Sequence, residues 1–339
     1  MLVKRIGVDL AKNVIQVHGV DGRDRVVVRK RLKRSALLAY FAQLPPCLVG
    51  LEACSGAHHW ARRLQAMGHE VRLMAARFVA PYRQNDKNDG NDAEAVCEAV
   101  GRPRMRFVAI KSEEQQALLG LHRARELMVG QRTALVNHLR GLLAEYGVVI
   151  GPGRARLRQA LPGILEDADN GLPDLARELF NDLYSRLLEL EGHVERYDVR
   201  LKRLAAEMEA ARRLMALGGI GPVTATALVA SVGDARVFRN GRQFAAWLGL
   251  VPRQHSSGDR VRYGRITKRG DRYLRTLLIH GARALMRHLG ARTDRTSRWA
   301  MALRERRGFN KACVALAARQ ARVVWALLAK GQAYQPHRG

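Results

Sequence analysis

Four acidic residues fall where short apolar runs end or where a helix begins. Asp9 ends the first apolar run of the chain, and Glu52 ends a later one. Asp89 and Asp92 stand three residues apart at the start of a predicted helix, so both carboxylates face one side of it. Phosphodiester chemistry often uses two divalent ions about 3.5–4 Å apart, held by carboxylates that converge from separate elements. The four acids therefore predict a site for Mg²⁺, in which Mn²⁺ would substitute.

Each of these acids also has an ordinary explanation. Asp9 and Glu52 are acceptable ends for any strand, and Asp89 and Asp92 would stabilise a helix N-terminus by facing its partial positive charge. Asp86 precedes the expected helix and is left outside the set. The order of the four acids along the chain, together with a strongly basic surface, favours the metal site.

A second reactive group is a serine hydroxyl in the segment 252–258. Guanidinium groups around a serine can stabilise the charge that develops when its hydroxyl attacks phosphorus. Ser256-Ser257-Gly258 is equally a good turn sequence, so the residues alone leave nucleophile and turn both open. Basic side chains that surround this segment, and are predicted to bind nucleic acid, are Arg253, Arg260, Arg262, Arg265, Lys268 and Arg269.

The elements that would position the acids are predicted in the first hundred residues. Strand patterns alternate there with helix patterns, and an RNase H-like sheet would place the first and fourth strands side by side with a later helix across them. We therefore expect an α/β RNase H-like domain over residues 1–108. An actin-like fold opens in the same way, but the sequence lacks its second phosphate loop and Gly-rich adenosine segment. The expected strands are 6–9, 14–19, 25–30, 47–52 and 71–74, and the expected helices are 35–43, 55–67 and 90–100.

Two long amphipathic stretches follow, Ser112 to Glu145 and Pro173 to Arg213. Leucines recur in both at helical spacing, and Gly151-Pro152-Gly153 separates them. Two long helices joined by a break predict an antiparallel coiled-coil arm over 109–213, acting as linker and oligomerisation element. A helical linker packed on a domain is the plainer alternative.

The last third, residues 214–332, is expected to form a mainly α-helical domain. Helices are predicted near 243–248, 271–289 and 310–328, with a small hairpin around 258–263. The segment around Gly219 and Gly221 resembles a helix-hairpin-helix, whose backbone N–H groups would bind a phosphate. A plain turn between two helices is the alternative.

The charge of the chain points to a polyanion as its partner. The 339 residues carry 59 Lys and Arg against 31 Asp and Glu, a net charge of +28, and residues 241–339 hold 22 basic against 4 acidic residues. Nucleic acid is the usual polyanion that neutralises such a surplus. No run of about 18 uncharged apolar residues occurs, so neither a membrane span nor a signal peptide is expected. Four scattered cysteines fit a reducing cytoplasm.

Four motifs of this chain resemble one family, the DEDD insertion-sequence transposases, which are relatives of the Piv DNA invertase and include bridge-RNA-guided recombinases. The likeness extends from about Lys4 to Ala329. It implies a RuvC-like N-terminal domain, a coiled-coil linker and a C-terminal transposase domain, with Mg²⁺ held at the positions of the four acids. The motifs are Ile6-Gly7-Val8-Asp9-Leu10-Ala11-Lys12, Leu51-Glu52-Ala53-Cys54-Ser55-Gly56, Asn88-Asp89-Gly90-Asn91-Asp92-Ala93 and Pro252-Arg253-Gln254-His255-Ser256-Ser257-Gly258.

The resemblance also implies a covalent phosphoserine link to DNA, for which the matching position is Ser257, with Ser256 one residue away. Family members assemble as dimers or tetramers that pair a metal domain of one subunit with a serine domain of another. Some use an RNA encoded in the element's non-coding end. The expected partners are therefore DNA of the element ends and target, further copies of this chain and, for an RNA-guided member, a bridge RNA. The expected location is the bacterial cytoplasm, at the nucleoid.

The predicted function is that of a DNA transposase that cuts and rejoins strands through a phosphoserine intermediate. The first alternative is a structure-specific nuclease, resembling a Holliday-junction resolvase, in which metals activate water and no covalent intermediate forms. The second is a non-catalytic nucleic-acid-binding protein with a decayed site, against which the four intact acids argue.

Overall fold

The computed structural model describes residues 2–84, 86, 88–258, 260–291 and 294–335. These residues belong to two compact units, Met1–Glu113 and Glu114–Gly339.

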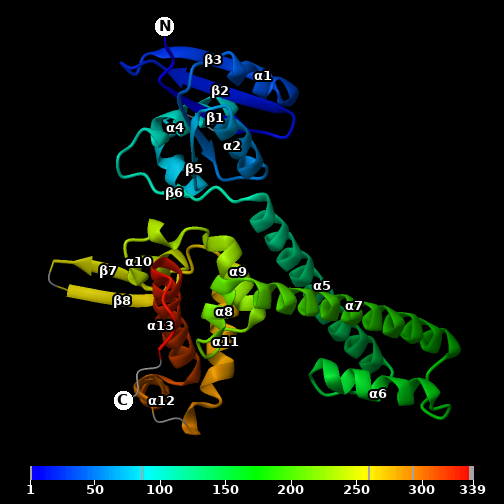
Figure 1. Ribbon diagram of the computed structural model, residues 1–339. Helices are drawn as coiled ribbons and strands as arrows, with labels where there is room; N and C mark the ends of the chain where they lie inside the picture. The colour runs from blue at the N-terminus through cyan, green and yellow to red at the C-terminus, as the bar shows by residue number, and fades with distance from the viewer. Residues whose placement is uncertain (1, 85, 87, 259, 292–293, 336–339) are drawn as a thin grey trace. The chain divides into compact units, whose positions relative to one another are not determined.

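The first unit is built on a mixed six-stranded sheet with the strand order β3-β2-β1-β4-β5-β6 (Figure 1). β1 runs antiparallel to β2 and parallel to β4, so the first and fourth strands are neighbours, as predicted. The strands are β1 (Arg5–Leu10), β2 (Val14–Val20), β3 (Val26–Lys33), β4 (Leu48–Glu52), β5 (Glu70–Met74) and β6 (Phe107–Val108).

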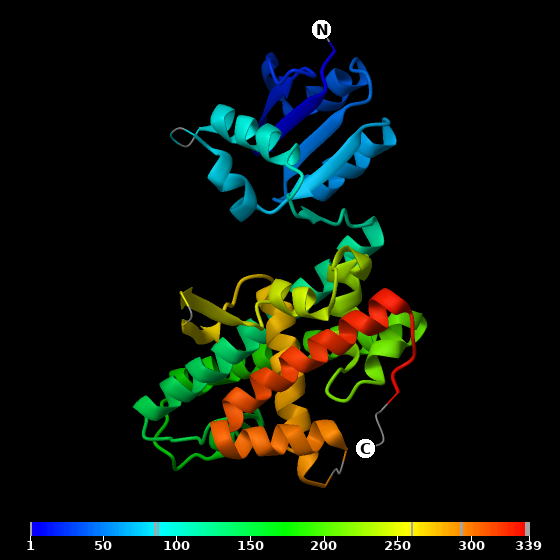
Figure 2. The same cartoon turned by 90° about the vertical axis from the view of Figure 1, so that its left-hand side faces the viewer.

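Helices cover both faces of this sheet. On one face, alternate strand residues such as Val8 pack with α1 (Leu37–Ala42) and α2 (Ala57–Ala66) in an apolar core. On the other face lies α4 (Asp89–Val100), whose Val96 joins a second, smaller core. Figure 2 shows α4, in cyan, alongside the sheet. We call this second side the α4 face.

The α/β order expected of an RNase H-like domain is confirmed, and two details differ. α2 begins one residue later than expected, at Ala57. The residue before it, Gly56, has a φ of 82°, in the left-handed region that favours glycine. Gly56 rather than Ser55 is therefore the N-cap residue. The two-residue strand β6 was not predicted, and neither were the short helices α3 (Ala76–Val79) and η2 (Ala80–Tyr82).

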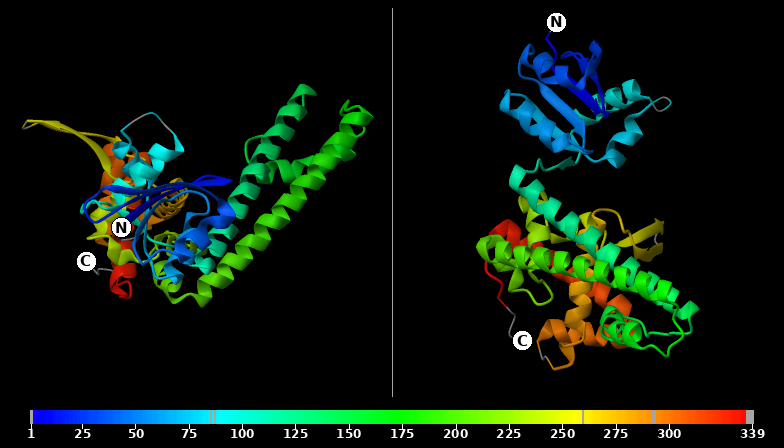
Figure 3. Two further views of the ribbon diagram at one scale, coloured as in Figure 1. Left: turned by 90° about the horizontal axis from the view of Figure 1, so that it is seen from above. Right: turned by 90° about the vertical axis from the view of Figure 1, so that its right-hand side faces the viewer.

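The second unit begins with long helices (Figure 3). α5 (Glu113–Glu145) and α7 (Asp174–Glu207) match the predicted stretches, but Met208 leaves the helical region with ψ of 113°, and α8 (Glu209–Met215) follows it. The unpredicted α6 (Arg154–Glu166) shares an apolar cluster with the adjoining ends of α5 and α7. Their pairing as a coiled-coil arm stays a prediction.

A buried polar network joins α5 to the rest of the second unit. His122 lies 3.0 Å through Nδ1 from the Tyr273 hydroxyl and 3.1 Å through Nε2 from Oγ1 of Thr226. Because Thr226 donates its hydroxyl hydrogen to the Pro222 carbonyl, it accepts from Nε2, and Nδ1 accepts from Tyr273. Burial, followed by the charge of Arg125, lowers the pKa of His122 to about 4, which keeps the ring neutral.

The rest of the second unit packs around one apolar core, to which α13 contributes Cys313, Leu316 and Val324. Among the described residues, α13 alone is long and apolar enough by composition to cross a membrane, and its burial here identifies it as a core helix. The other elements are α9 (Pro222–Val232), η3 (Ala235–Val237), α10 (Gly241–Trp247), β7 (Pro252–Ser257), β8 (Arg260–Ile266), α11 (Arg272–Met286), η4 (Leu289–Ala291), α12 (Arg295–Arg307) and α13 (Phe309–Lys330).

Candidate functional site

Asp9 and Glu52 lie side by side where two parallel strands end. Val8 of β1 pairs with Leu51 of β4, and the acids are the next residues of both strands. Side chains alternate along a strand, and Val8 and Leu51 belong to the core under α1 and α2. Both carboxyl groups therefore leave the sheet on the α4 face.

Two glycines allow α4 to approach the backbone of the sheet. Gly7 and Gly50 are paired across β1 and β4, each two residues before an acid. A Cβ at Gly7 would lie 2.2 Å from the Ala93 carbonyl oxygen and 2.2 Å from the Cys97 backbone nitrogen. A Cβ at Gly50 would lie 2.7 Å from Cβ of Val100. The missing side chains let α4 lie directly on the strands that carry Asp9 and Glu52.

The N-terminus of α4 carries the other two acids. Asn88 caps the helix by accepting a 2.8 Å hydrogen bond from the Asn91 N–H, so the helix begins at Asp89. Asp89 is exposed, while Asp92 is half-buried one turn further on. Nη1 of Arg83 donates to Oδ1 of Asp92 at 3.0 Å. Arg83 therefore occupies one oxygen of the Asp92 carboxylate.

The other three acids act electrostatically on Asp9. The pKa of Asp9 is raised from 3.8 to about 6, first by burial and then by the negative charges of Asp92, Asp89 and Glu52. A divalent cation would relieve this repulsion, and carboxylate oxygens suit a hard cation, so the donor set fits Mg²⁺. Within the described residues no three Asp, Glu, His or Cys groups already surround one point. The assignment of the four acids as metal ligands stays a prediction.

Two further side chains border this site. The thiol of Cys54 has its pKa raised by burial and then by the charges of Glu52 and Asp9. Arg34 donates through Nη1 to the Ala11 carbonyl at 3.2 Å and lies over the Trp60 ring at 5.1 Å from its centroid. The site therefore has a fixed guanidinium near its rim.

The predicted serine segment forms the hairpin of β7 and β8, every residue of which except Ile266 is exposed. Ser257 pairs with Arg260 and His255 pairs with Arg262, so these four side chains share one face of the ribbon. Arg253 joins them, because its Cβ lies 3.7 Å from the position a Cβ would take on Gly264. This face, which we call the basic face of the hairpin, ends at Ser257.

The structure distinguishes the two candidate serines. Ser256 lies on the opposite face of the ribbon, where its Oγ accepts a 2.9 Å hydrogen bond from Nε2 of Gln254. The Ser257 hydroxyl has no hydrogen-bond partner among the described residues and stands directly before the turn at Gly258, whose φ is 55°. Of the two serines, Ser257 is thus the one on the arginine-lined face whose hydroxyl hydrogen-bonds to no described residue, although its role as nucleophile stays a prediction.

The remaining predicted nucleic-acid contacts are dispersed. Arg265 lies at a shift in the strand register, beyond the regular pairs of the basic face, and Lys268 and Arg269 lie in the turn that ends the hairpin. That turn packs against Gly249, where a Cβ would lie 2.2 Å from the Arg269 carbonyl oxygen. The structure therefore gathers Arg253, Arg260 and Arg262 on the serine's face and separates the others from them.

Gly219 and Gly221 lie in the turn between α8 and α9. A Cβ on Gly219 would lie 2.8 Å from the Gly281 carbonyl oxygen, so packing against α11 is enough to require glycine there. Gly221 is exposed at the N-terminus of α9, where the first turn of a helix leaves backbone N–H groups without intrahelical partners. Phosphate binding by this segment stays a prediction.

Two models of transposase families match parts of this chain. A family model described as "Transposase IS116/IS110/IS902 family" matches residues 211–298. A second model, for the DEDD transposase of IS110 and described as "Transposase", matches residues 6–148 and so includes all four acids.

Several relatives match over nearly the whole chain. It is 51% identical over 337 residues to a probable family 20 transposase of Pseudomonas aeruginosa, a match that covers 99% of this chain and 100% of that protein. It is 44% identical to the transposase for insertion sequence element IS1111A of Coxiella burnetii, over 98% of this chain and 92% of that protein. The transposase for insertion sequence element IS1328 of Yersinia enterocolitica is 36% identical, over 98% of each chain.

Proposed function

This chain belongs to the IS116/IS110/IS902 family of insertion-sequence transposases, and from that membership we propose that it cuts and rejoins DNA with four carboxylates and one serine. It is a DNA transposase, and its DEDD domain implies a divalent metal. The proposal adds that the metal is Mg²⁺, held by Asp9, Glu52, Asp89 and Asp92. When bound, Mg²⁺ would draw charge from the scissile phosphate and make it easier to attack.

Ser257 is the proposed nucleophile. Its Oγ forms a bond to phosphorus, the bond from phosphorus to one DNA oxygen breaks, and the serine proton ends on that oxygen as a new DNA hydroxyl. A hydroxyl of the partner strand then attacks the phosphoserine, and Ser257 regains a proton. One phosphate ester replaces another in each step, so no nucleotide hydrolysis is required. Arg260 and Arg262 stabilise the negative charge on phosphorus during both steps.

The remaining parts of the proposal concern assembly and partners. The segments 1–108, 109–213 and 214–332 act as metal domain, coiled-coil arm and serine domain. The arm joins copies into dimers or tetramers, in which the serine of one subunit serves the metal site of another. The exposed Gly221 turn binds a DNA or RNA phosphate, and the protein works at the nucleoid. An RNA from the element is a candidate further partner, which the experiment below tests.

One observation carries this proposal. The pKa of Asp9 responds to the charges of Glu52, Asp89 and Asp92, although the four acids come from three separate elements, β1, β4 and α4. Four carboxylates brought within electrostatic reach of one another destabilise a fold unless something cationic uses them. A site for the phosphodiester chemistry of a transposase supplies that use.

A covalent-trapping experiment tests the proposal. The protein is incubated with labelled DNA from the element ends and Mg²⁺, with and without RNA from the flanking non-coding region, and is then denatured in detergent. We expect label on the protein, lost in Ser257→Ala and in Asp9→Asn and retained in the matched control Ser256→Ala. Dependence of the adduct on the added RNA identifies the RNA as a partner.

The alternatives give different results. Cut DNA without bound label, unchanged by Ser257→Ala, would establish the resolvase-like nuclease and exclude the serine step. Binding without any cutting, unchanged by Asp9→Asn, would indicate a protein whose site has decayed.

A further inference from the structure

A row of polar side chains crosses the first unit from the acids to the edge of the sheet. Asp9 on β1 pairs with Gln16 on β2, and Gln16 pairs with Arg31 on β3. Residues directly opposite each other in antiparallel strands have Cα atoms about 5 Å apart and point to the same face. Arg31 therefore lies about 10 Å from Asp9 on the α4 face, with Gln16 between them.

The basic residues of β3 divide between the two faces of the sheet. Arg29, Arg31 and Lys33 alternate along the strand on the α4 face, as the ion pair of Arg29 with Glu94 of α4 confirms at 3.7 Å. Lys30 points the other way, with Nζ 5.0 Å from the centroid of the Tyr40 ring in α1. All four cations are exposed.

A cavity of about 310 Å³ lies along this row. Its walls are the exposed edge of the sheet and the first turns of α4, beside the acids at the helix N-terminus. We call it the β3 groove; its lining includes Gln16, Arg29, Arg31, Gly90, Asn91 and Glu94. Lys30 also borders the groove, but its charged Nζ lies on the opposite face, over Tyr40.

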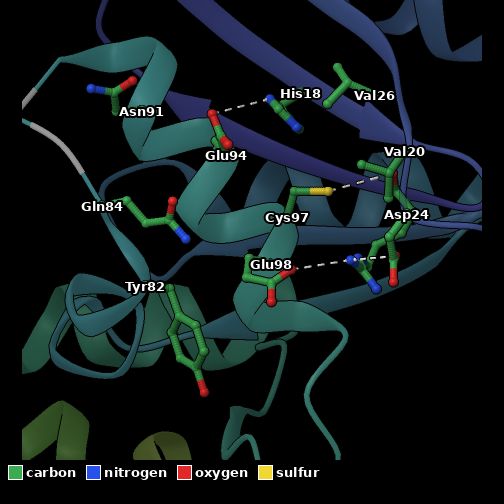
Figure 4. Close-up of a pocket in the computed structure, with 11 residues that line it drawn as sticks. His18, Val20, Asp24, Val26, Tyr82, Gln84, Asn91, Glu94, Cys97 and Glu98 are labelled. Carbon is green, nitrogen blue, oxygen red and sulfur yellow. Dashed lines mark hydrogen bonds and ion pairs between the residues drawn. The ribbon is translucent and has the colours of Figure 1, made fainter.

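The charge changes sign beyond the groove. Arg31 and Lys33 have no carboxylate partner among the described residues, whereas Arg29 is partly neutralised by Glu94. The adjoining cavity, of about 140 Å³, contains Glu94, Glu98 and Asp24 (Figure 4). There Oε2 of Glu98 lies 3.4 Å from Nη2 of Arg5. Glu94 points toward His18, with its Oε2 4.0 Å from Nδ1 of the ring. A polyanion leaving the acids is therefore attracted along Arg31 and Lys33, whereas in the second cavity Arg5 is already paired with Asp24 and Glu98.

We propose that the β3 groove holds the DNA strand on one side of the scissile phosphate, with Arg31 on a backbone phosphate roughly one to three nucleotides away. The Gln16 side chain donates a hydrogen bond to the part of the DNA strand that lies between the acids and Arg31. Arg29 and Lys33 flank Arg31. Arg31 and Gln16 are positioning residues, because they fix the strand and not the reacting atoms. The inference rests on the proposed function, which puts the scissile phosphate at the acids. DNA is favoured over RNA because the row is continuous with those acids.

The neighbouring Lys30 provides a matched control. Arg31→Gln and Lys30→Gln remove the same charge from adjacent exposed positions of one strand, but from opposite faces. Binding of full-length protein to labelled element-end duplex is measured over a range of salt concentrations without divalent cations, so that no strand is cut. We expect Arg31→Gln to weaken binding about five- to tenfold and to reduce the salt slope by about 0.7–0.9. Lys30→Gln leaves both nearly unchanged, and Arg31→Lys restores most of the binding.

Phosphate ethylation interference gives the local readout that a structural role would not change. With wild-type protein, ethylation of a phosphate beside the cleavage position weakens binding, and Arg31→Gln removes that sensitivity. Equal DNA affinity and equal salt slope of Arg31→Gln and Lys30→Gln would overturn the inference. So would an Arg31→Gln variant that binds the element's RNA more weakly but keeps the wild-type DNA ethylation pattern. The Ser257 adduct assay decides the proposed function separately. An adduct formed equally by both variants, together with unchanged ethylation, would refute only the groove.

Discussion

The two proposed reactive regions of this protein are built on opposite physical principles. The acids stand on a packed sheet, where α4 touches the backbone at Gly7. The surrounding core holds the acids close together in spite of the repulsion that raises the pKa of Asp9. Ser257 stands on an exposed two-stranded ribbon and has no side-chain partner among the described residues. The difference indicates that the acid site is assembled by folding, whereas the serine site is completed only by what binds to it.

The largest expected effect is a loss of stability, and it is tested with the same glycine-to-alanine substitution in each region. Gly7→Ala places a Cβ 2.2 Å from backbone atoms of α4 and should destabilise the first unit by about 3 kcal/mol or more. Gly264→Ala in the hairpin adds a Cβ at an ordinary 3.7 Å contact and should change stability by less than about 0.5 kcal/mol. Thermal unfolding of both variants measures this. Equal losses would mean that the hairpin is as tightly packed as the sheet.

The next effect concerns acid sensitivity in the second unit. His122 has a pKa of about 4 when folded and 6.5 when unfolded, so the unfolded state binds the proton more readily. Its stabilising contribution is complete above pH 6.5 and is lost as the pH falls toward 4, by about 2–4 kcal/mol. We expect His122→Gln to flatten that part of the pH dependence of the melting temperature. An unchanged slope would show that the ring is already charged in the folded protein.

Asp9 should change stability in the opposite direction. Its folded pKa of about 6 exceeds the unfolded value of 3.8, so the favourable contribution is complete below 3.8 and is lost as the pH rises through 6. Discounted for its partial exposure, the cost at neutral pH is about 1–2 kcal/mol. Without metal, Asp9→Asn should therefore raise the melting temperature at pH 7 and abolish stabilisation by added Mg²⁺. A variant less stable than wild type at pH 7 would contradict the repulsion described above.

The smallest expected effect is on Mg²⁺ binding, and it tests whether Arg83 must leave Asp92 before a cation can bind. Arg83 and a cation compete for the carboxylate of Asp92. Arg83→Ala should cost at most about 1 kcal/mol of stability, because the ion pair is partly exposed, and should tighten Mg²⁺ binding a few-fold. Titration of the melting temperature with Mg²⁺ measures both. Weaker Mg²⁺ binding would show that Arg83 orients Asp92 for the metal.

Much of the acid region could be predicted from sequence because its signals are periodic. Strand alternation put Asp9 and Glu52 on one face, and the spacing of Asp89 and Asp92 put both on one side of a helix. The same patterns contained Gly7 and Gly50, two residues before the acids, but only the structure shows what occupies the space their side chains would fill. The residues Arg83, Gln16 and Arg31 were missed because their neighbours depend on register and on loop geometry.

The second unit was harder to predict for a different reason. α12 has a polar, arginine-rich composition in which helical periodicity is hidden, and α6 contains Pro162. The hairpin was expected, but its register, which separates Ser257 from Ser256 by face, cannot be read from residues that are nearly all exposed. The distinction between the serines therefore came from the strand pairing.

The close contact of α4 with Gly7 and Gly50 has a consequence for how copies of the element lose function. A change in the first or second base of a glycine codon replaces the residue or ends the chain. At these two positions even the single methyl group of alanine would collide with the helix that carries two of the acids. A gene copy can therefore keep all four acids and Ser257 and still encode an inactive protein. Surveys of genomes that judge copies by their reactive residues alone would count such silent copies as active.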